Sequence, residues 1–288
     1  MDLHQYRDVD KRGTITRVTY EATNSAGERW TKYANVYLPY GYDENQKYDI
    51  VYLMHGGGGN PDAWLDCAQI KNALDRGFEE GKAKPFIVVF PTYYNLDPTE
   101  RRRIEGVNAE WENEQIRAFQ KELAEDLIPA VESRFSTYAK DTTPEGLAGS
   151  RLHRAFGGFS MGGGVTWYVF LYNLEIVSVF LPLSGDCWEI QPMGGRLVPE
   201  ETAKVLAERT RAKGMTGKDF RIYGGTGDKD MGLDNMKPML EAMTAYPDLF
   251  DLEEDPAKGN LHLAVKEDAV HAYEQVYHHV WHYLPYLF

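Results

Sequence analysis

Short runs of apolar residues recur along the chain, separated by longer stretches in which apolar residues return every three or four positions. Continuous apolar runs are typical of strands covered on both faces, and the three-to-four spacing is typical of helices with one buried face. The pattern therefore predicts strands at 50–54, 86–90, 154–159, 177–183, 220–223 and 261–265, and helices at 62–80, 111–132, 161–173, 200–213, 233–245 and 272–284.

The first forty residues have a different pattern. Apolar and polar residues alternate from Thr14 to Tyr20, and a second such stretch runs from Trp30 to Leu38 after a turn at 24–27. This alternation predicts two antiparallel strands at one edge of the sheet. No Gly/Ser- or Pro-rich linker divides the sequence, so we expect residues 1–288 to form one doubly wound α/β domain with a mostly parallel sheet.

Charge narrows the possible partners. The 31 Lys and Arg residues against 44 Asp and Glu give a net charge of −13, which disfavours binding to nucleic acid. The basic cluster Arg101-Arg102-Arg103 has acidic neighbours and is interpreted as a solvated loop. No apolar run reaches the roughly 18 residues that a membrane-spanning helix needs, and a membrane partner is not expected.

The cellular compartment stays open on residue evidence alone. The first residues have neither the basic region nor the apolar core of a signal peptide, which fits a cytoplasmic protein or a secreted domain without its signal. Cys67 and Cys187 lack metal-site spacing, and either one disulfide or two free thiols is compatible with the sequence.

The sequence Gly158-Phe159-Ser160-Met161-Gly162 follows a predicted strand and precedes a predicted apolar helix. This is the context of a nucleophile elbow, in which glycines on both sides allow a tight strand-to-helix turn. A serine without a catalytic role in a glycine-rich turn is the alternative. The position between strand and helix favours Ser160 as a catalytic nucleophile.

A serine nucleophile of this type needs a histidine base later in the chain. Five histidines follow Ser160. His262 lies in the last predicted strand, and His278, His279 and His282 lie on the last helix, away from its apolar stripe, where surface positions are expected. His271 alone lies in the loop between these elements, where active-site groups gather in α/β folds, and it is the predicted base.

The acid that orients the histidine should follow an earlier strand. Strand 220–223 runs into Gly224-Gly225-Thr226-Gly227-Asp228-Lys229-Asp230. Asp228 directly follows the glycine-rich turn and is the predicted acid. Asp230 is the near alternative and Asp186 a more distant one, and any of the three could instead be a turn or helix-capping residue.

A glycine-rich loop, His55-Gly56-Gly57-Gly58-Gly59, follows the strand 50–54. Such a loop lets backbone N–H groups approach a reaction intermediate, and the sequence lacks the Lys-Ser/Thr ending of a phosphate-binding loop. The amides of Gly57 and Met161 are therefore the predicted oxyanion hole.

With these motifs in place, the chain resembles the feruloyl esterases of the first carbohydrate-esterase family, within the esterase D-like α/β-hydrolases. The resemblance covers about Arg17 to Leu284. It rests on residues 51–59 with Trp64 shortly after, on the Ser-Met-Gly-Gly run within 153–163, and on Gly225-Thr226-Gly227-Asp228, which matches the family's Gly-Thr-x-Asp turn. The resemblance implies an α/β-hydrolase fold with helices on both faces of the sheet, and assigns the acid role to Asp228.

Two departures from the family pattern affect the substrate more than the chemistry. The final histidine lies in Ala269-Val270-His271-Ala272-Tyr273, where the family usually has Gly-Gly-His-x-Trp, and the segment 245–260 is long. Trp188 leaves a strand on the active-site side and Trp64 follows the oxyanion loop. Both are predicted to line an acyl slot, with packing under a loop as the alternative for Trp188.

The resemblance predicts a serine esterase that releases ferulate from feruloylated arabinoxylan, with no metal or organic cofactor. It also implies a secreted protein, which can be a module of a larger cell-wall-degrading enzyme. Acetyl-xylan esterase is the main alternative; S-formylglutathione hydrolase, siderophore esterase and mycolyltransferase are more distant ones. A non-catalytic carbohydrate-binding module is the alternative from a different class of protein.

Overall fold

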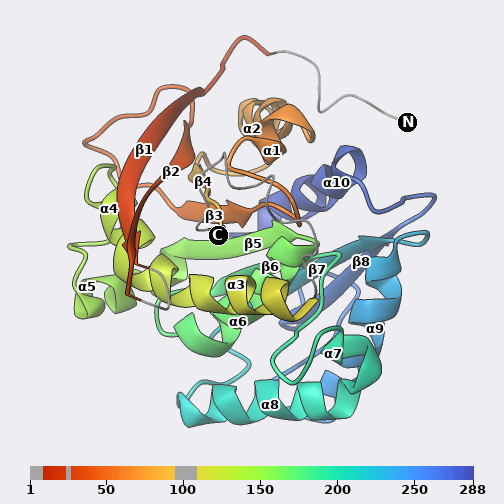
Figure 1. The fold of residues 1–288 in the computed structure, drawn as a ribbon. Helices are drawn as coiled ribbons and strands as arrows, with labels where there is room; N and C mark the ends of the chain where they lie inside the picture. Colours follow the sequence, from red (N-terminus) through yellow and green to blue (C-terminus); the bar gives the residue numbers. More distant parts are fainter. Residues whose placement is uncertain (1–8, 24–26, 95–108) are drawn as a thin grey trace.

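The computed structural model describes residues 9–23, 27–94 and 109–288, so the turn at 24–27 falls largely, and the cluster Arg101–Arg103 entirely, outside the described residues. One eight-stranded sheet, in the order β1-β2-β4-β3-β5-β6-β7-β8, runs through the molecule (Figure 1). Its strands are β1 Thr14–Thr23, β2 Arg29–Leu38, β3 Ile50–Met54, β4 Ile87–Phe90, β5 Arg154–Phe159, β6 Val179–Leu183, β7 Arg221–Gly227 and β8 Leu261–Lys266.

The pairing confirms the predicted mixed sheet. Strand β2 is antiparallel to both β1 and β4, whereas the strands from β4 through β3, β5, β6 and β7 to β8 run parallel to one another. Every residue of β3, β4, β5 and β6 is buried, as the continuous apolar runs indicated. The carboxyl ends of the parallel strands meet at one edge of the sheet, which is the edge that carries active sites in such folds.

Helices cover both faces of this sheet (Figure 1). Side chains of α1, α2 and α10 pack in one hydrophobic cluster, and side chains of α3, α6, α8 and α9 pack in a second cluster on the opposite face. The helices are α1 Ala63–Asp66, α2 Ile70–Glu79, α3 Ala109–Glu122, α4 Ile128–Glu132, α5 Pro144–Gly149, α6 Met161–Asn173, α7 Gly194–Leu197, α8 Pro199–Ala212, α9 Met231–Met243 and α10 Tyr273–Tyr283. No helix in the described part of the chain is both long and apolar enough to cross a membrane.

Differences from the predicted elements are local. The predicted helix 111–132 is divided by a π-helical turn at Leu123–Leu127, and β7 continues to Gly227. His279 is buried rather than exposed, because its ring packs against Gly225 of β7, where even a methyl group would come within 2.5 Å of the ring. The apolar stripe of α10 is therefore wider than the sequence pattern indicated.

Candidate active site

Ser160 lies on a sharp turn between β5 and α6. Its backbone angles, φ 56° and ψ −117°, are unusual for a residue with a side chain. The turn is possible because glycines approach each other closely: a methyl group on Gly158 would lie 2.6 Å from Gly162, and one on Gly162 would lie 2.6 Å from the backbone of Met54 and His55. The Ser160 N–H donates to the Leu183 carbonyl at 2.8 Å, which ties the turn to β6.

Ser160 and His271 meet at the carboxyl edge of the sheet. The His271 Nε2 atom lies 2.8 Å from Ser160 Oγ, and its Nδ1 atom lies 2.7 Å from Asp230 Oδ1. An ionised Asp230 carboxylate can only accept hydrogen bonds, so Nδ1 carries the proton and Nε2 accepts from the serine hydroxyl. The three side chains thus form the hydrogen-bonded arrangement of a serine nucleophile, its base and an orienting acid.

Asp228 is not the residue that contacts His271, and the prediction that it would do so is wrong. Strand β7 continues to Gly227, and the Asp228 N–H still pairs with the Lys266 carbonyl of the neighbouring strand. The Asp228 carboxylate is exposed and accepts from the Ala269 N–H at 3.2 Å. The chain needs two further residues before a carboxylate can turn toward the histidine, and that carboxylate belongs to Asp230.

Asp230 also caps the helix that follows it. One carboxylate oxygen accepts from the Gly232 N–H at 2.6 Å, and the other accepts from the Ser184 hydroxyl at 2.7 Å. Burial alone would raise the pKa of Asp230, but the hydrogen bonds from His271, Gly232 and Ser184 outweigh it and hold the pKa below its ordinary value. Asp230 is therefore ionised and fixed in position beside the imidazole.

The glycine loop after β3 lies against Ser160. A methyl group on Gly56 would come within 3.3 Å of Ser160 Cβ, and one on Gly57 would come within 3.2 Å of Met161 Cγ. Among the described residues, the N–H groups of Gly57 and Met161 have no hydrogen-bond partner. Two unoccupied donors beside the nucleophile are what an oxyanion hole requires.

A cavity of about 250 Å³ opens beside Ser160 and His271. Trp188 lies in its wall as predicted, with Met161, Met193 and Met231 among the other lining residues. The Trp188 Nε1–H donates to Asp186 Oδ1 at 2.9 Å. The lining is mostly apolar apart from a few polar groups, which suits an apolar acyl group.

Asp186 lies in the wall of the same cavity and was a distant alternative for the triad acid. Its carboxylate accepts from Trp188 and, at 2.8 Å, from the Gly195 N–H, so its hydrogen bonds orient the cavity wall. Burial raises the pKa of Asp186 to about 6, although both hydrogen bonds lower it.

Trp64 does not line this cavity, and the prediction for it is wrong. Its side chain is 1 % exposed and its Nε1–H donates to the Met54 carbonyl at 2.9 Å. The indole packs edge-on against Tyr273 inside the hydrophobic cluster under α10. A tryptophan soon after the oxyanion loop can face the core as well as the site, and the spacing alone does not distinguish the two.

Two other predictions concern side chains away from the triad. Cys67 and Cys187 are both free thiols, the first exposed and the second buried. Within the described ranges, no three His, Cys, Asp or Glu side chains gather closely enough to hold a metal ion.

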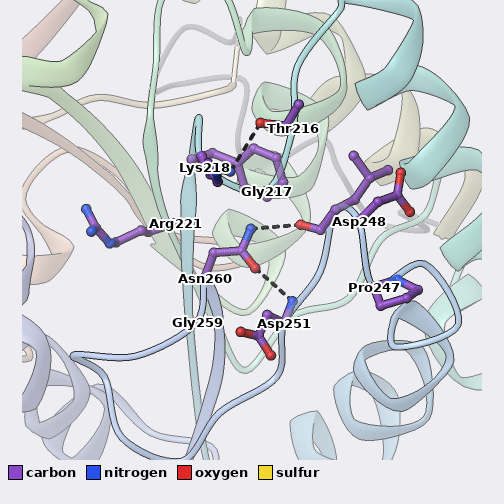
Figure 2. A pocket seen from close by; sticks show the side chains of 11 residues that line it. Thr216, Gly217, Lys218, Arg221, Pro247, Asp248, Asp251, Gly259 and Asn260 are labelled. Carbon is purple, nitrogen blue, oxygen red and sulfur yellow. Dashed lines mark hydrogen bonds between the residues drawn. The ribbon is translucent and has the colours of Figure 1, made fainter.

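A second, larger cavity of about 640 Å³ lies at the opposite edge of the sheet, before β7 and β8. Residues 247–251 and 259–260, from the long segment before β8, form one side of it, and residues 216–221 form the other. In Figure 2 the Asn260 amide donates to the backbone carbonyl of Leu249 and accepts from the Asp251 N–H, so both bonds join it to residues 247–251 on its own side of the cavity. None of the predicted site residues lies there.

The chain belongs to the Esterase family: a model of this family, described as "Putative esterase", matches residues 25–286. It is 41 % identical over 277 residues to endo-1,4-beta-xylanase Y of Acetivibrio thermocellus, and 30 % identical over 249 residues to an endo-1,4-beta-xylanase/feruloyl esterase of Xylanibacter ruminicola. These matches cover 96 % and 85 % of this chain but 23 % and 28 % of the relatives, so the chain spans about a quarter of their length.

Solved structures give the same family relationship. A variant of the feruloyl esterase module from Clostridium thermocellum, complexed with sinapinate, matches with a TM-score of 0.84 and 38 % identity, over 99 % of this chain and 92 % of that one. A ferulic acid esterase from the fungus Anaeromyces mucronatus matches with a TM-score of 0.72 and 21 % identity, over 98 % and 94 % of the two chains. The second likeness concerns the fold alone, and both agree with the predicted α/β-hydrolase architecture.

Proposed function

We propose that this protein is a serine esterase that releases ferulate and related hydroxycinnamates from esters of plant cell-wall polysaccharide such as arabinoxylan. The observation that carries the proposal is the hydrogen-bonded chain Ser160–His271–Asp230 at the mouth of an apolar cavity. The relatives with feruloyl esterase in their names, at 30 to 38 % identity, support the choice of acyl group.

The first half of the reaction acylates the serine. Ser160 Oγ attacks the ester carbonyl while His271 Nε2 takes the hydroxyl proton, and Asp230 stabilises the imidazolium that forms. Negative charge moves to the carbonyl oxygen, where the N–H groups of Gly57 and Met161 donate to it. The tetrahedral intermediate then collapses: the bond to the sugar oxygen breaks, and His271 returns the proton to that oxygen.

The second half hydrolyses the acyl-enzyme. His271 Nε2 takes a proton from water, whose oxygen attacks the feruloyl carbonyl, and the same two amides again stabilise the oxyanion. Collapse of this intermediate releases the carboxylic acid and returns the proton to Ser160 Oγ. The aromatic ring lies against Trp188 and the methionines of the cavity throughout both halves, because apolar side chains of this kind pack well on a phenyl ring.

The proposed substrate also bears on where the protein acts. Cell-wall polysaccharide is too large to enter a cell, so an enzyme that cleaves esters on it must work outside. The curated relatives are named as xylanases of which this chain matches only a quarter, and that supports a role as one module of a larger cell-wall-degrading enzyme.

A substrate panel tests the proposal: methyl ferulate, methyl p-coumarate, methyl sinapate, an alkyl acetate and acetylated xylan are compared by kcat/KM. We expect methyl ferulate to exceed the alkyl acetate at least about tenfold, equivalent to about 1.4 kcal/mol of differential transition-state binding. Efficient deacetylation of xylan with no release of ferulate would overturn the proposed acyl group in favour of acetyl-xylan esterase.

A further inference from the structure

The oxyanion loop contains a tight turn whose central peptide has two possible orientations. The Gly59 N–H donates to the Gly56 carbonyl at 3.0 Å, and Gly58 has a φ of +67°. A turn with positive φ at its third residue is of type II, and rotation of the peptide between its second and third residues would convert it to type I. Glycines on both sides of that peptide place little steric restriction on the rotation.

Tyr94 binds the peptide that would rotate. The Gly58 N–H, which belongs to this peptide, donates to the Tyr94 hydroxyl oxygen at 2.9 Å. The Tyr94 hydroxyl in turn donates to Glu112 Oε1 of α3 at 2.8 Å. Rotation of the peptide would direct the N–H away from Tyr94 and break this chain of hydrogen bonds, so the chain stabilises one orientation of the turn.

Tyr273 binds the other end of the turn. The Gly56 N–H donates to the Tyr273 hydroxyl oxygen at 2.7 Å, and His55 Nδ1 lies 2.7 Å from the Gly56 carbonyl oxygen. A carbonyl only accepts, so Nδ1 is the donor. The Gly56 carbonyl and the Gly57 N–H belong to one planar trans peptide and point in opposite directions, so a fixed carbonyl also fixes the direction of the Gly57 N–H.

We propose that Tyr94 and Tyr273 are positioning residues that hold the oxyanion turn from its two ends, with Glu112 as the anchor of Tyr94. The tyrosines accept from the N–H groups of Gly58 and Gly56, which belong to the peptides on either side of the Gly56–Gly57 peptide, and leave the Gly57 N–H of that central peptide to donate to the substrate oxygen. This inference rests on the proposed esterase chemistry. It assigns a use in catalysis to hydroxyl groups that do not touch the substrate.

The surroundings of Tyr273 suit this role. Burial raises the pKa of Tyr273 to about 12, although the Gly56 hydrogen bond lowers it, so the hydroxyl stays protonated at neutral pH. Its ring is held edge-on by both Trp64 and Phe159. Phe159 also packs on His271, so the same aromatic cluster supports the base and the oxyanion loop.

The test removes one hydroxyl at a time, in Tyr94→Phe and Tyr273→Phe, and measures kcat and KM with p-nitrophenyl acetate together with the inhibition constant of ferulate. Glu112→Gln tests the anchor. Tyr42→Phe is the matched control, because the Tyr42 hydroxyl also accepts a backbone N–H, that of Ser136 at 2.8 Å, at the opposite edge of the sheet. Thermal unfolding of each variant reports the general cost of losing such a bond.

Loss of an oxyanion donor costs about 10²–10³ in kcat. Release of either flanking peptide should loosen the Gly56–Gly57 peptide between them and cost part of this, about tenfold in each single variant and about a hundredfold in the double variant. We expect KM and the ferulate inhibition constant to change less than about twofold, because the ground state does not use the donor. Glu112→Gln should lower kcat less than Tyr94→Phe, because an amide oxygen can still accept. The Tyr42→Phe control should unfold at a similarly lowered temperature with unchanged kcat.

The positioning role of Tyr94 and Tyr273 would be overturned if kcat of the single variants stayed within about twofold of wild type. It would also be overturned if kcat fell no further in these variants than in Tyr42→Phe. Failure of the proposed function has a different signature. A wild-type protein that hydrolyses p-nitrophenyl acetate but not methyl ferulate would overturn the feruloyl substrate, and the roles of Tyr94 and Tyr273 could still be measured with the acetate. A wild-type protein inert towards both esters would overturn both proposals.

Discussion

The two edges of the central sheet each carry a cavity, and the smaller cavity holds the chemistry. At the amino ends of β7 and β8, a cavity of about 640 Å³ is lined by polar groups that bond to each other: Asn260 donates to the Leu249 carbonyl and accepts from the Asp251 N–H, both at 2.8 Å (Figure 2). At the carboxyl ends, a cavity of about 250 Å³ holds Ser160 and His271, and the N–H groups of Gly57 and Met161 beside it have no partner among the described residues.

The contrast extends to the backbone. Ser160 and Ser184 at the carboxyl edge have positive φ angles of 56° and 52°. Residues in such conformations persist only where the surroundings enforce them, and they gather at functional sites. In this molecule, the strained turn at Ser160 and the two donors without a partner among the described residues identify the site, whereas cavity volume alone points to the wrong edge. Substitutions at the two edges should therefore have opposite consequences for activity and stability.

The largest expected effect is at the nucleophile. Ser160→Ala removes the atom that forms the acyl-enzyme, and kcat for methyl ferulate should fall by about 10⁶, as for other triad serines. The unfolding temperature should not decrease, because alanine keeps the backbone hydrogen bond to the Leu183 carbonyl and loses only the hydroxyl that contacts His271. A folded Ser160→Ala protein that kept a tenth of wild-type turnover, measured by ferulate release, would contradict the assignment.

The next effect distinguishes the two aspartates of one loop. Asp230→Asn should lower kcat by about 10⁴, because an amide at this position favours the wrong imidazole tautomer. Asp228→Asn is the matched control: the Asp228 carboxylate is exposed and accepts from the Ala269 N–H at 3.2 Å, and an amide oxygen can accept the same bond. We expect its kcat to be within about twofold of wild type. Equal losses in both variants would show that the loop acts as a unit.

This pair of aspartates also illustrates how far the sequence can be interpreted. The strands β3 and β5, the elbow at Ser160 and the loop that carries His271 could be predicted because each is marked by a local pattern of glycines or apolar residues. The acid has no such local mark. Its identity depends on the residue at which β7 ends, and strand ends are set by pairing with β8. The helix-capping position of Asp230 before α9 was the one available signal.

Other errors and omissions have the same cause. Whether Trp64 faces the site or the core depends on how α1 packs, and the contacts of Tyr94 and Tyr273 with the glycine loop join segments far apart in the chain. The departure from the family pattern at Tyr273 was visible in the sequence. Its consequence, a hydroxyl that accepts the Gly56 N–H, required the structure.

A smaller effect is expected where the carboxyl-edge cavity selects the acyl group. Trp188→Ala removes an aromatic wall that a hydroxycinnamoyl ring would contact and an acetyl group would not reach. The ratio of kcat/KM for methyl ferulate over p-nitrophenyl acetate should fall about tenfold, about 1.4 kcal/mol, while turnover of the acetate stays within about twofold of wild type. A parallel fall for both esters would instead assign Trp188 a structural role, through its hydrogen bond to Asp186.

The smallest effect on activity is expected at the opposite edge. Asn260→Ala leaves the Leu249 carbonyl and the Asp251 N–H without their partner in a site where the asparagine is 4 % exposed. The free energy of unfolding, measured with urea, should fall by about 1–3 kcal/mol, because buried backbone groups without partners are costly. Asn260→Asp keeps the acceptor for the Asp251 N–H, and its free energy of unfolding should fall less.

Because this cavity lies across the sheet from Ser160, kcat/KM for methyl ferulate should be unchanged in both variants under conditions where they remain folded. A loss of turnover in the folded variants would mean that the two edges are coupled, and the division between a stabilising edge and a catalytic edge would have to be abandoned.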